Sequence, residues 1–329
     1  MEPSARPFET VTVFGGATLD RVSRSSAPPV MGASNPGTMR RIVGGVGFNV
    51  ATVLARLGMP TRMVTAIGDD SDGEAIVTAA GGVGIDTGGI AVIHGASTAG
   101  YHATFDDRGN LIIGIADMKV CEAITPAAVA AAMSGSGDRD LWVVDANLPE
   151  VTLAFLTAEA TSAGRRVAAL TVSPVKALRL VPLLDDLSYL FTNRKEAAAL
   201  LDRDPNDPSL VVTELAGGLA GHRAATVVVT NGTDPLALAC QRDVRSFAPL
   251  RAAVKGVNGA GDSFAAGMIA ALSEGLTPAE AVRFGLAAAV MTLEAGSIVA
   301  APFSKDALAE RIGAGPQPAG AVARERIAS

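Results

Sequence analysis

Short runs of apolar residues alternate along this chain with segments in which apolar residues recur every three or four positions. A run of about four to eight apolar residues predicts a buried strand, whereas the recurrence predicts a helix with one apolar face. The alternation is most regular after about residue 125. There the pattern predicts strands at 141–144, 166–170, 189–192 and 224–230, and helices at 126–133, 150–163, 176–183 and 194–201. Such alternation predicts an α/β fold with a mostly parallel sheet and helices on both faces.

The first third of the chain is less regular and predicts a second, smaller sheet. A Pro-, Ser- and Gly-rich stretch at 21–40 and short apolar strands after residue 90 are typical of antiparallel hairpins. Hairpins from about 14–44 and 91–116 are therefore expected to form a small lid. The other predicted elements are strands at 11–16, 61–67, 91–93, 100–105 and 111–116, and helices at 48–58, 74–80, 263–274, 278–294 and 304–312.

Composition narrows the class of protein. The chain has 329 residues, 49% of them hydrophobic, which is enough for a large core. We expect one domain over 10–312, with flexible tails at 1–9 and 313–329. The net charge of −6 without a basic block argues against a nucleic-acid partner, and no strongly apolar stretch has the length of a membrane span. Two distant cysteines indicate buried thiols and a cytoplasmic location.

The glycine-rich segment at 257–264 carries the strongest chemical signal. Gly259, Ala260 and Gly261 precede Asp262, and an apolar helical pattern begins at once. A glycine-rich loop that leads into a helix presents free backbone N–H groups at the positive end of the helix dipole, which binds anions. An acid beside such a site fits a general base that takes a proton from a hydroxyl group. The segment predicts phosphoryl transfer to an alcohol, and a tight turn with an aspartate cap is the structural alternative.

A second glycine-rich segment opens the helix predicted at 48–58. Gly44 and Gly45 allow close approach of the backbone to a ligand, and Asn49 offers both a donor and an acceptor, so we interpret the segment as a sugar-binding site. A dinucleotide-binding loop is the rival interpretation. It is disfavoured because position 50 is valine, where that loop needs a third glycine or alanine.

Three further groups follow predicted strands, where ligands bind in such sheets. Asp20 follows the first strand and can accept hydrogen bonds from sugar hydroxyls, although a turn aspartate explains it equally well. Asn193 and Glu196 can reach one point at a helix start, as an Mg²⁺ site or as a helix cap. Thr230 and Gly232 are candidates for the edge of a nucleotide pocket.

Taken in order, these segments resemble the ribokinase-like, or PfkB, carbohydrate kinase family, over residues 10 to 303. The resemblance rests on GGVGFNVATVLARLG, NRKE, TNG and GAGDSFAAG. It implies a three-layer α/β/α sandwich with a β-hairpin lid, which often mediates homodimers. The resemblance also implies that Asp262 is the catalytic base and that residues 259–261 form the anion hole. Asn193 and Glu196 would position the ATP phosphate and an Mg²⁺ held through water. Asp20, Gly45 and Asn49 would bind the sugar, and Thr230 and Gly232 would lie beside ATP.

A closer resemblance is to the pseudouridine kinase branch of this family, through segment 98–126, Asp145–Leu148 and Ser173-x-x-Lys176. It implies ATP-dependent phosphorylation of the 5′-hydroxyl of pseudouridine. Candidate contacts to the nucleobase are Thr98, Tyr101, His102 and Asn147. Gly256 stands where the wider family usually has an acid, so a monovalent-cation site lacks one of its expected ligands here. Asn258 is expected near ATP or the nucleobase.

Two alternatives stay open at this point. The low aromatic content, 4%, favours a small substrate, as in a ribokinase- or fructokinase-like sugar kinase, and a purine nucleoside kinase belongs to the same group of alternatives. A nucleoside-binding protein without catalysis is the second alternative, and the intact Asp262, Asn193 and Glu196 argue against it.

Overall fold

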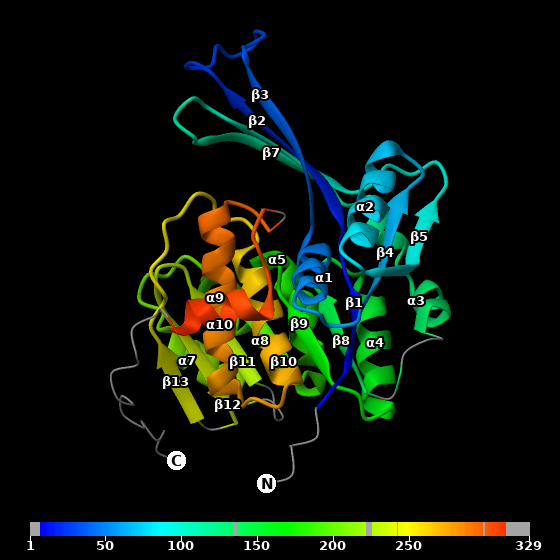
Figure 1. The fold of residues 1–329 in the computed structure, drawn as a ribbon, viewed down its shortest axis with the longest axis vertical. Helices are drawn as coiled ribbons and strands as arrows, with labels where there is room; N and C mark the ends of the chain where they lie inside the picture. The colour runs from blue at the N-terminus through cyan, green and yellow to red at the C-terminus, as the bar shows by residue number, and fades with distance from the viewer. Residues whose placement is uncertain are drawn as a thin grey trace.

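The structure is a computed structural model of the chain, and it describes residues 7–133, 137, 139–221, 226–241, 243–298 and 300–313. The tails predicted at 1–9 and 313–329 therefore lie mostly outside the described residues. Two sheets organise the described part. A large sheet forms the body, and a small one projects from it as a lid (Figure 1).

The body is built on a nine-stranded sheet whose pairings are parallel except at one edge, where β12 is antiparallel to both of its neighbours, β11 and β13. Alternate side chains of a central strand face opposite layers, so that Leu141 and Val143 belong to one core and Trp142 and Val144 to the other. From edge to edge the strands are β13 (Asp243–Phe247), β12 (Asp234–Cys240), β11 (Thr226–Asn231), β10 (Tyr189–Asn193), β9 (Val167–Leu170), β8 (Asp140–Asp145), β1 (Thr10–Phe14), β4 (Thr61–Gly68) and β5 (Asp86–Ile93).

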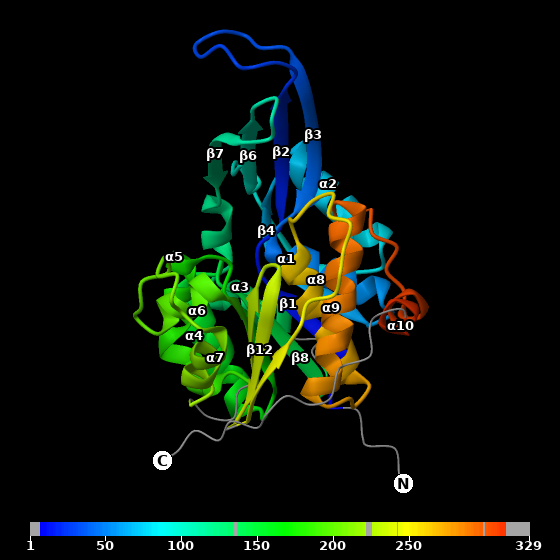
Figure 2. The ribbon, with the colours of Figure 1, turned by 90° about the vertical axis from the view of Figure 1, so that its left-hand side faces the viewer.

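Helices cover both faces of this sheet, which confirms the predicted three-layer α/β/α fold (Figure 2). No described helix is both long enough and apolar enough to cross a membrane. One layer holds α1 (Val46–Arg56), α2 (Ser71–Gly82), α8 (Ala260–Ser273), α9 (Pro278–Ala295) and α10 (Lys305–Gly313). The other holds α3 (Pro126–Met133), α4 (Glu150–Ser162), α6 (Arg194–Leu200), α7 (Val212–Leu219) and the 3₁₀ helices η1 (Lys119–Ala123) and η2 (Leu178–Asp186), with the short α5 (Pro174–Ala177) beside them.

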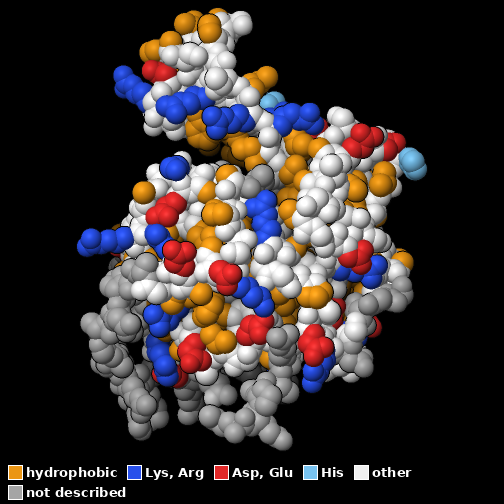
Figure 3. Space-filling model, viewed as in Figure 1, with side chains coloured by type: hydrophobic (Ala, Val, Ile, Leu, Met, Phe, Trp, Pro, Cys, Tyr) orange, Lys and Arg blue, Asp and Glu red, His pale blue; other side chains and the backbone are white. Residues whose placement is uncertain are grey.

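The lid is a four-stranded sheet in the order β3-β2-β6-β7. Its strands are β2 (Thr18–Ser25), β3 (Gly37–Gly44), β6 (Gly100–Phe105) and β7 (Leu111–Asp117). The lid stands above the body, and a hollow separates the two in the space-filling view (Figure 3). Lys and Arg side chains line the lid above this hollow.

The structure differs from the predicted elements in three places. The helix predicted at 176–183 is mostly the 3₁₀ helix η2, which contains Pro182, because a proline cannot donate the hydrogen bond of an α-helix. The strand predicted at 91–93 is the end of β5 and pairs with β4 in the body rather than in the lid. The hydrophobic pattern does not predict α7, because two glycines interrupt its sequence VTELAGGL.

Candidate active site

The start of α8 forms the centre of the candidate site. The helix begins at Ala260, directly after Gly259, whose backbone has a φ of 78°. A side chain at 259 would also lie 2.6 Å from the side chain of Ile298, so the turn requires glycine on both counts. The first N–H groups of a helix have no carbonyl partner within the helix. The turn therefore offers a positive end for an anion, with Asp262 in the first turn of the helix.

Asp262 is held by the other glycine-rich segment. Nδ2 of Asn49, on α1, donates to Oδ2 of Asp262 at 2.7 Å, although the two residues are 213 positions apart in the sequence. The two strongest motifs of the sequence thus meet at one carboxylate. The contact fixes the orientation of the Asp262 side chain beside the helix terminus.

The surroundings of Asp262 raise its pKa to about 7. Burial is the largest cause, since it disfavours the charged carboxylate. The hydrogen bond from Asn49 lowers the pKa, and the charges of Asp145 and Glu196 raise it. A carboxyl group with a pKa near neutrality is suited to accept a proton at physiological pH.

A cavity of about 200 Å³ opens beside Asp262 at the carboxyl ends of β9, β10 and β11. Val172 contributes to its wall with a φ of 68°, which is unusual for a β-branched residue and often accompanies a functional site. The polar side chains of its wall belong to Thr171, Thr192, Asn193, Glu196, Thr230 and Asp262. The structure therefore brings the predicted nucleotide-side residues Asn193, Glu196 and Thr230 together around one space.

Asn193 and Glu196 also cap α6. Oδ1 of Asn193 accepts from the N–H of Glu196 at 3.1 Å, and Oε2 of Glu196 accepts from the N–H of Asn193 at 3.2 Å, so the structural alternative for this pair is correct. Oε2 of Glu196 also accepts from the hydroxyl of the buried Thr171. In the described part of the chain, no group of three or more His, Cys, Asp or Glu side chains could hold a metal ion. Glu196 on the cavity wall offers one carboxylate, which fits an Mg²⁺ held mainly through water and phosphate.

Two glycine turns, at residues 15–16 and 45–47, pack against each other at the start of α1. A side chain at Gly45 would lie 2.6 Å from the carbonyl oxygen of Gly16, and one at Gly47 would lie 2.9 Å from Cα of Gly15. The buried carboxylate of Asp145 joins the turns by accepting from the N–H groups of Gly16 and Gly47, both at 2.9 Å. Backbone packing therefore requires these glycines, whatever their contact with a ligand.

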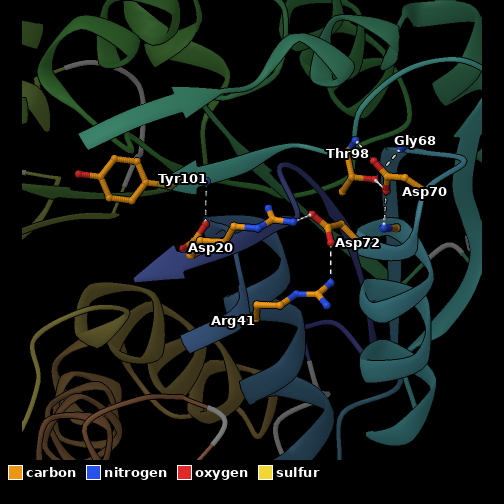
Figure 4. Close-up of polar contacts among 9 residues, drawn as sticks. Asp20, Arg41, Gly68, Asp70, Asp72, Thr98 and Tyr101 are labelled. Atoms are coloured by element: carbon orange, nitrogen blue, oxygen red, sulfur yellow. Dashed lines mark hydrogen bonds and ion pairs between the residues drawn. The ribbon is translucent and has the colours of Figure 1, made fainter. Parts of the chain in front are cut away.

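Asp20 lies at the root of the lid, as Figure 4 shows. Burial raises the pKa of its carboxyl, while a hydrogen bond from the N–H of Tyr101, at 3.2 Å, lowers it. A side chain at Gly44 would lie 3.1 Å from Oδ2 of Asp20, so glycine leaves room for this carboxylate. The Tyr101 side chain projects over Gly114 of the neighbouring strand β7. Asp20, Gly44 and Tyr101 are thus neighbours.

Thr98 does not belong to this group, which corrects the predicted contact to a nucleobase. Its hydroxyl donates to Oδ1 of Asp70 at 2.6 Å and accepts from the N–H of Gly68 at 2.9 Å (Figure 4). The side chain is buried, and these two bonds tie the segment before β6 to the start of α2. Thr98 has a structural role at the lid root.

A cluster of three charged side chains, which we call the Asp72 clamp, joins the lid to α2 near Thr98. Oδ2 of Asp72, on α2, pairs with Arg21 of β2, and Oδ1 pairs with Arg41 of β3, each at 2.5 Å (Figure 4). Arg21 and Arg41 are directly opposite each other on the paired strands. Like charges in this position repel, so Asp72 offsets the repulsion and fastens the lid to the body.

Asn147 follows β8 and is engaged on both sides. Its Oδ1 accepts from Nζ of Lys176 at 2.5 Å, and its side chain also hydrogen-bonds Asp145, which lowers the pKa of that acid against the larger effect of burial. Arg179 donates to the carbonyl oxygens of residues 146, 147 and 148. The predicted site residue is therefore the centre of a fixed polar network.

Three predicted positions lie at the periphery. Gly232, with a φ of 62°, is in the exposed turn between β11 and β12, and it does not line the cavity that Thr230 lines. Asn258 is exposed and does not line this cavity either. At Gly256 a side chain would lie 2.6 Å from the carbonyl oxygen of Gly296, so this backbone leaves no room for an acid there.

Comparison with known proteins decides the family. The family model described as "pfkB family carbohydrate kinase" matches residues 9–303. The chain belongs to the PfkB family. It is 28% identical to the pseudouridine kinase of Escherichia coli K12, over 88% of this chain and 91% of the relative. It is 26% identical to the ribokinase of Bacillus subtilis, over 87% and 93%. A solved carbohydrate kinase from Agrobacterium tumefaciens has a TM-score of 0.80 and 33% identity, over 94% and 98%.

As a PfkB protein, the chain is a phosphotransferase that acts on a hydroxyl group of a sugar or nucleoside. The family resemblance includes Asp145 and Lys176 only as members of matching segments and gives them no role, and it does not include Thr171. In the structure, Asp145, Thr171 and Lys176 contact predicted site residues through their side chains. Their signal in the sequence is weak, because nothing near them in the chain shows which distant side chains they contact.

Proposed function

We propose that this protein is an ATP-dependent, Mg²⁺-requiring kinase that phosphorylates the 5′-hydroxyl of pseudouridine. The contact between Asn49 and Asp262 carries the proposal. It links α1, the helix that follows the glycine turns of the lid root, to a carboxyl group in the first turn of α8 whose pKa is raised to about 7. That is the position of a base which takes a proton from a hydroxyl while a phosphoryl group is transferred to it.

In this mechanism Asp262 accepts the proton of the 5′-hydroxyl as the oxygen attacks the γ-phosphorus of ATP. The first N–H groups of α8 donate to the equatorial phosphoryl oxygens, and Asn49 keeps Asp262 in line. Asp20, on the lid root, accepts hydrogen bonds from ribose hydroxyls. The lid covers the hollow above the site and limits access of water, which would otherwise hydrolyse ATP (Figure 3).

The nucleotide side rests on the cavity beside β10. Asn193 and Thr230 line it, which supports a contact from them to ATP, and Glu196 on the same wall would hold Mg²⁺ through water. Mg²⁺ supplies neutralisation of phosphate charge when it is bound. The buried hydroxyl of Thr171 fixes Oε2 of Glu196, which leaves the carboxylate in one orientation toward the cavity.

Two observations support pseudouridine as the substrate: the similarity to the E. coli pseudouridine kinase and the position of Tyr101 on the lid. Its side chain is 37% exposed and comes from the strand next to Asp20. A ring in this position offers a nucleobase a surface for stacking. A sugar kinase of the ribokinase type is the second candidate, and the similar identity to the B. subtilis ribokinase favours it.

The deciding experiment is ATP consumption by the purified protein with Mg²⁺ and, in parallel, pseudouridine, uridine, adenosine, ribose and fructose. A preference for pseudouridine of at least about tenfold in kcat/KM supports the proposal. Preferred turnover of a free sugar would replace it with the ribokinase-type candidate. Saturable nucleoside binding without any phosphotransfer would point to a protein that has lost catalysis.

We also propose that the lid pairs with the lid of a second copy of this chain. Its outer strands expose apolar side chains that a monomer leaves in water: Met39, Leu111, Ile113 and Ile115. Light scattering after size-exclusion chromatography tests this, with Ile113→Lys expected to convert a dimer to a monomer. A monomeric native protein at micromolar concentration would contradict it.

A further inference from the structure

A lysine to which the predicted site assigns no role contacts one of the predicted site residues. Lys176 lies on the short helix α5, which begins after Ser173. Its Nζ donates to Oδ1 of Asn147 at 2.5 Å, and within the described chain this is its one hydrogen-bond partner. An ammonium group has three donors, so this contact leaves two for a ligand.

The partner of Lys176 is unusually well fixed. The N–H of Asn147 donates to Oδ1 of Asp145 at 2.8 Å, and the side-chain amide reaches the same acid. Arg179 holds the carbonyl oxygens on either side of Asn147. Asn147 is only 8% exposed. A flexible lysine side chain bound to so rigid an acceptor loses most of its freedom before any ligand arrives, which favours ligand binding.

The position of Asn147 assigns Lys176 to the acceptor rather than to ATP. Nδ2 of Asn147 lies 3.1 Å from the point where a side chain on Gly16 would begin. Gly16 belongs to the turn that packs on Gly45, at the root of the lid. Neither Lys176 nor Asn147 lines the cavity around Asn193, Glu196 and Thr230.

We infer that Lys176 is a specificity-determining residue whose ammonium group, positioned by Asn147, donates to an oxygen of the phosphoryl acceptor. If the proposed function holds, this oxygen is a carbonyl group of the uracil ring. A cation that donates but cannot accept selects carbonyl oxygens and rejects amino groups at the same place. Lys176 then explains how a site with few aromatic residues distinguishes a nucleoside from its free sugar.

The test compares binding of ligands to Lys176→Met, Lys176→Arg and the native protein by calorimetry, using pseudouridine, ribose and a non-hydrolysable ATP analogue. Lys305→Met, which removes an exposed lysine paired with Glu274, is the matched control. We expect Lys176→Met to weaken pseudouridine binding by about tenfold to a hundredfold, as for loss of a hydrogen bond to a charged group. Ribose and the ATP analogue should bind as before, and Lys176→Arg should recover part of the loss.

A double-mutant cycle separates this role from a structural one. Asn147→Ala should weaken pseudouridine binding in the native background and have little further effect on Lys176→Met, because Asn147 acts through the lysine. Additive losses, an equal loss of ATP-analogue binding, or unchanged pseudouridine binding would each overturn the inference.

Failure of the proposed function gives a different result. In that case the native protein binds a free sugar and not pseudouridine, and the same variants are measured with that sugar. Weaker sugar binding by Lys176→Met with unchanged binding of the ATP analogue would still support the contact to the acceptor. Unchanged sugar binding would refute it.

Discussion

Nδ2 of Asn49 donates to Oδ2 of Asp262 at 2.7 Å and so joins the first third of the chain to the last. Asn49 comes from the helix that begins at the lid root, and Asp262 from the helix whose start is the proposed anion site. One hydrogen bond therefore joins the two segments that we propose to hold the acceptor and the phosphate. It also moderates the basicity of Asp262, because it stabilises the carboxylate against burial.

Replacement of Asp262 by asparagine tests its role as the base. Asparagine keeps an oxygen for Asn49 to donate to, so the geometry survives, but it cannot take a proton. We expect kcat to fall by about 10²- to 10⁴-fold while the Kd of ATP stays within about twofold. Steady-state kinetics and calorimetry check this, with Asp306→Asn on the exposed face of α10 as the control. Near-native activity of the variant would remove Asp262 from the mechanism.

The pH dependence of kcat/KM for the acceptor follows from the raised pKa of Asp262. The base must be deprotonated, so the rate should rise about tenfold per pH unit below about pH 7 and level off above it. Asn49→Ala removes the bond that lowers this pKa, so the bend of the profile should move to higher pH. A bend that stays in place in the variant, or a native profile that is flat from about pH 5 to 8, would contradict this account.

Much of the site can be predicted because its residues are of unusual type and order. Two glycine-rich segments lead into helices, and a polar residue, Asn49 or Asp262, lies in the first turn of each helix. The sequence alone therefore indicates both residues as candidate site residues. Their mutual contact cannot be predicted in this way, since nothing local links positions 213 apart. Fold class follows from strand–helix alternation, whereas the 3₁₀ form of η2 and the existence of α7 escape prediction, because Pro182 alters the first and two glycines weaken the pattern of the second.

The error at Thr98 has a different cause. A threonine beside a lid hairpin has the right chemistry for a nucleobase, and its sequence neighbours give no sign that Asp70, 28 positions earlier, occupies its hydroxyl. Asn147 has the same chemistry, and the structure adds the partner that gives it a role, Lys176. Side-chain partners distant in sequence are what a single sequence does not reveal.

The raised pKa of Asp262 also predicts a cost in stability. A carboxyl group with a higher pKa in the folded state binds its proton more tightly there, so its contribution to stability falls as the pH rises from about 4 to about 7. Asp262→Asn removes this penalty. We expect the variant to melt at a higher temperature than the native protein at about pH 8, with the difference shrinking toward about pH 4. Calorimetric melting at both pH values is the check, and a variant destabilised equally at both would refute the prediction.

The close backbone contact at Gly256 predicts that activity does not depend on a monovalent cation. No acid can occupy this position, because a side chain would meet the carbonyl oxygen of Gly296 at 2.6 Å. Exchange of K⁺ for tetramethylammonium at constant ionic strength should leave kcat within about twofold, whereas chelation of Mg²⁺ should abolish turnover. A marked stimulation by K⁺ would show that other groups of the protein hold such an ion.

The Asp72 clamp predicts that lid position and acceptor affinity are linked. Asp72→Asn keeps the size of the side chain and removes its charge, which leaves Arg21 and Arg41 opposed across β2 and β3 without compensation. Both arginines are partly exposed, so the loss should be modest, about 1 kcal/mol, or roughly a three- to tenfold rise in KM for the acceptor. KM for ATP should not change, because the cavity beside β10 lies in the body.

Hydrogen exchange locates the effect of this substitution in the fold. In the Asp72→Asn variant, backbone hydrogen exchange should become faster in β2 and β3 but not in β4. The reason is that the Asp72 clamp joins only β2 and β3 to α2. Asp86→Asn, which removes the pair with Arg62 at the edge of the body sheet, is the matched control and should change neither the exchange of the lid nor KM for the acceptor. Equal effects of the two variants would mean that the clamp has no special hold on the lid.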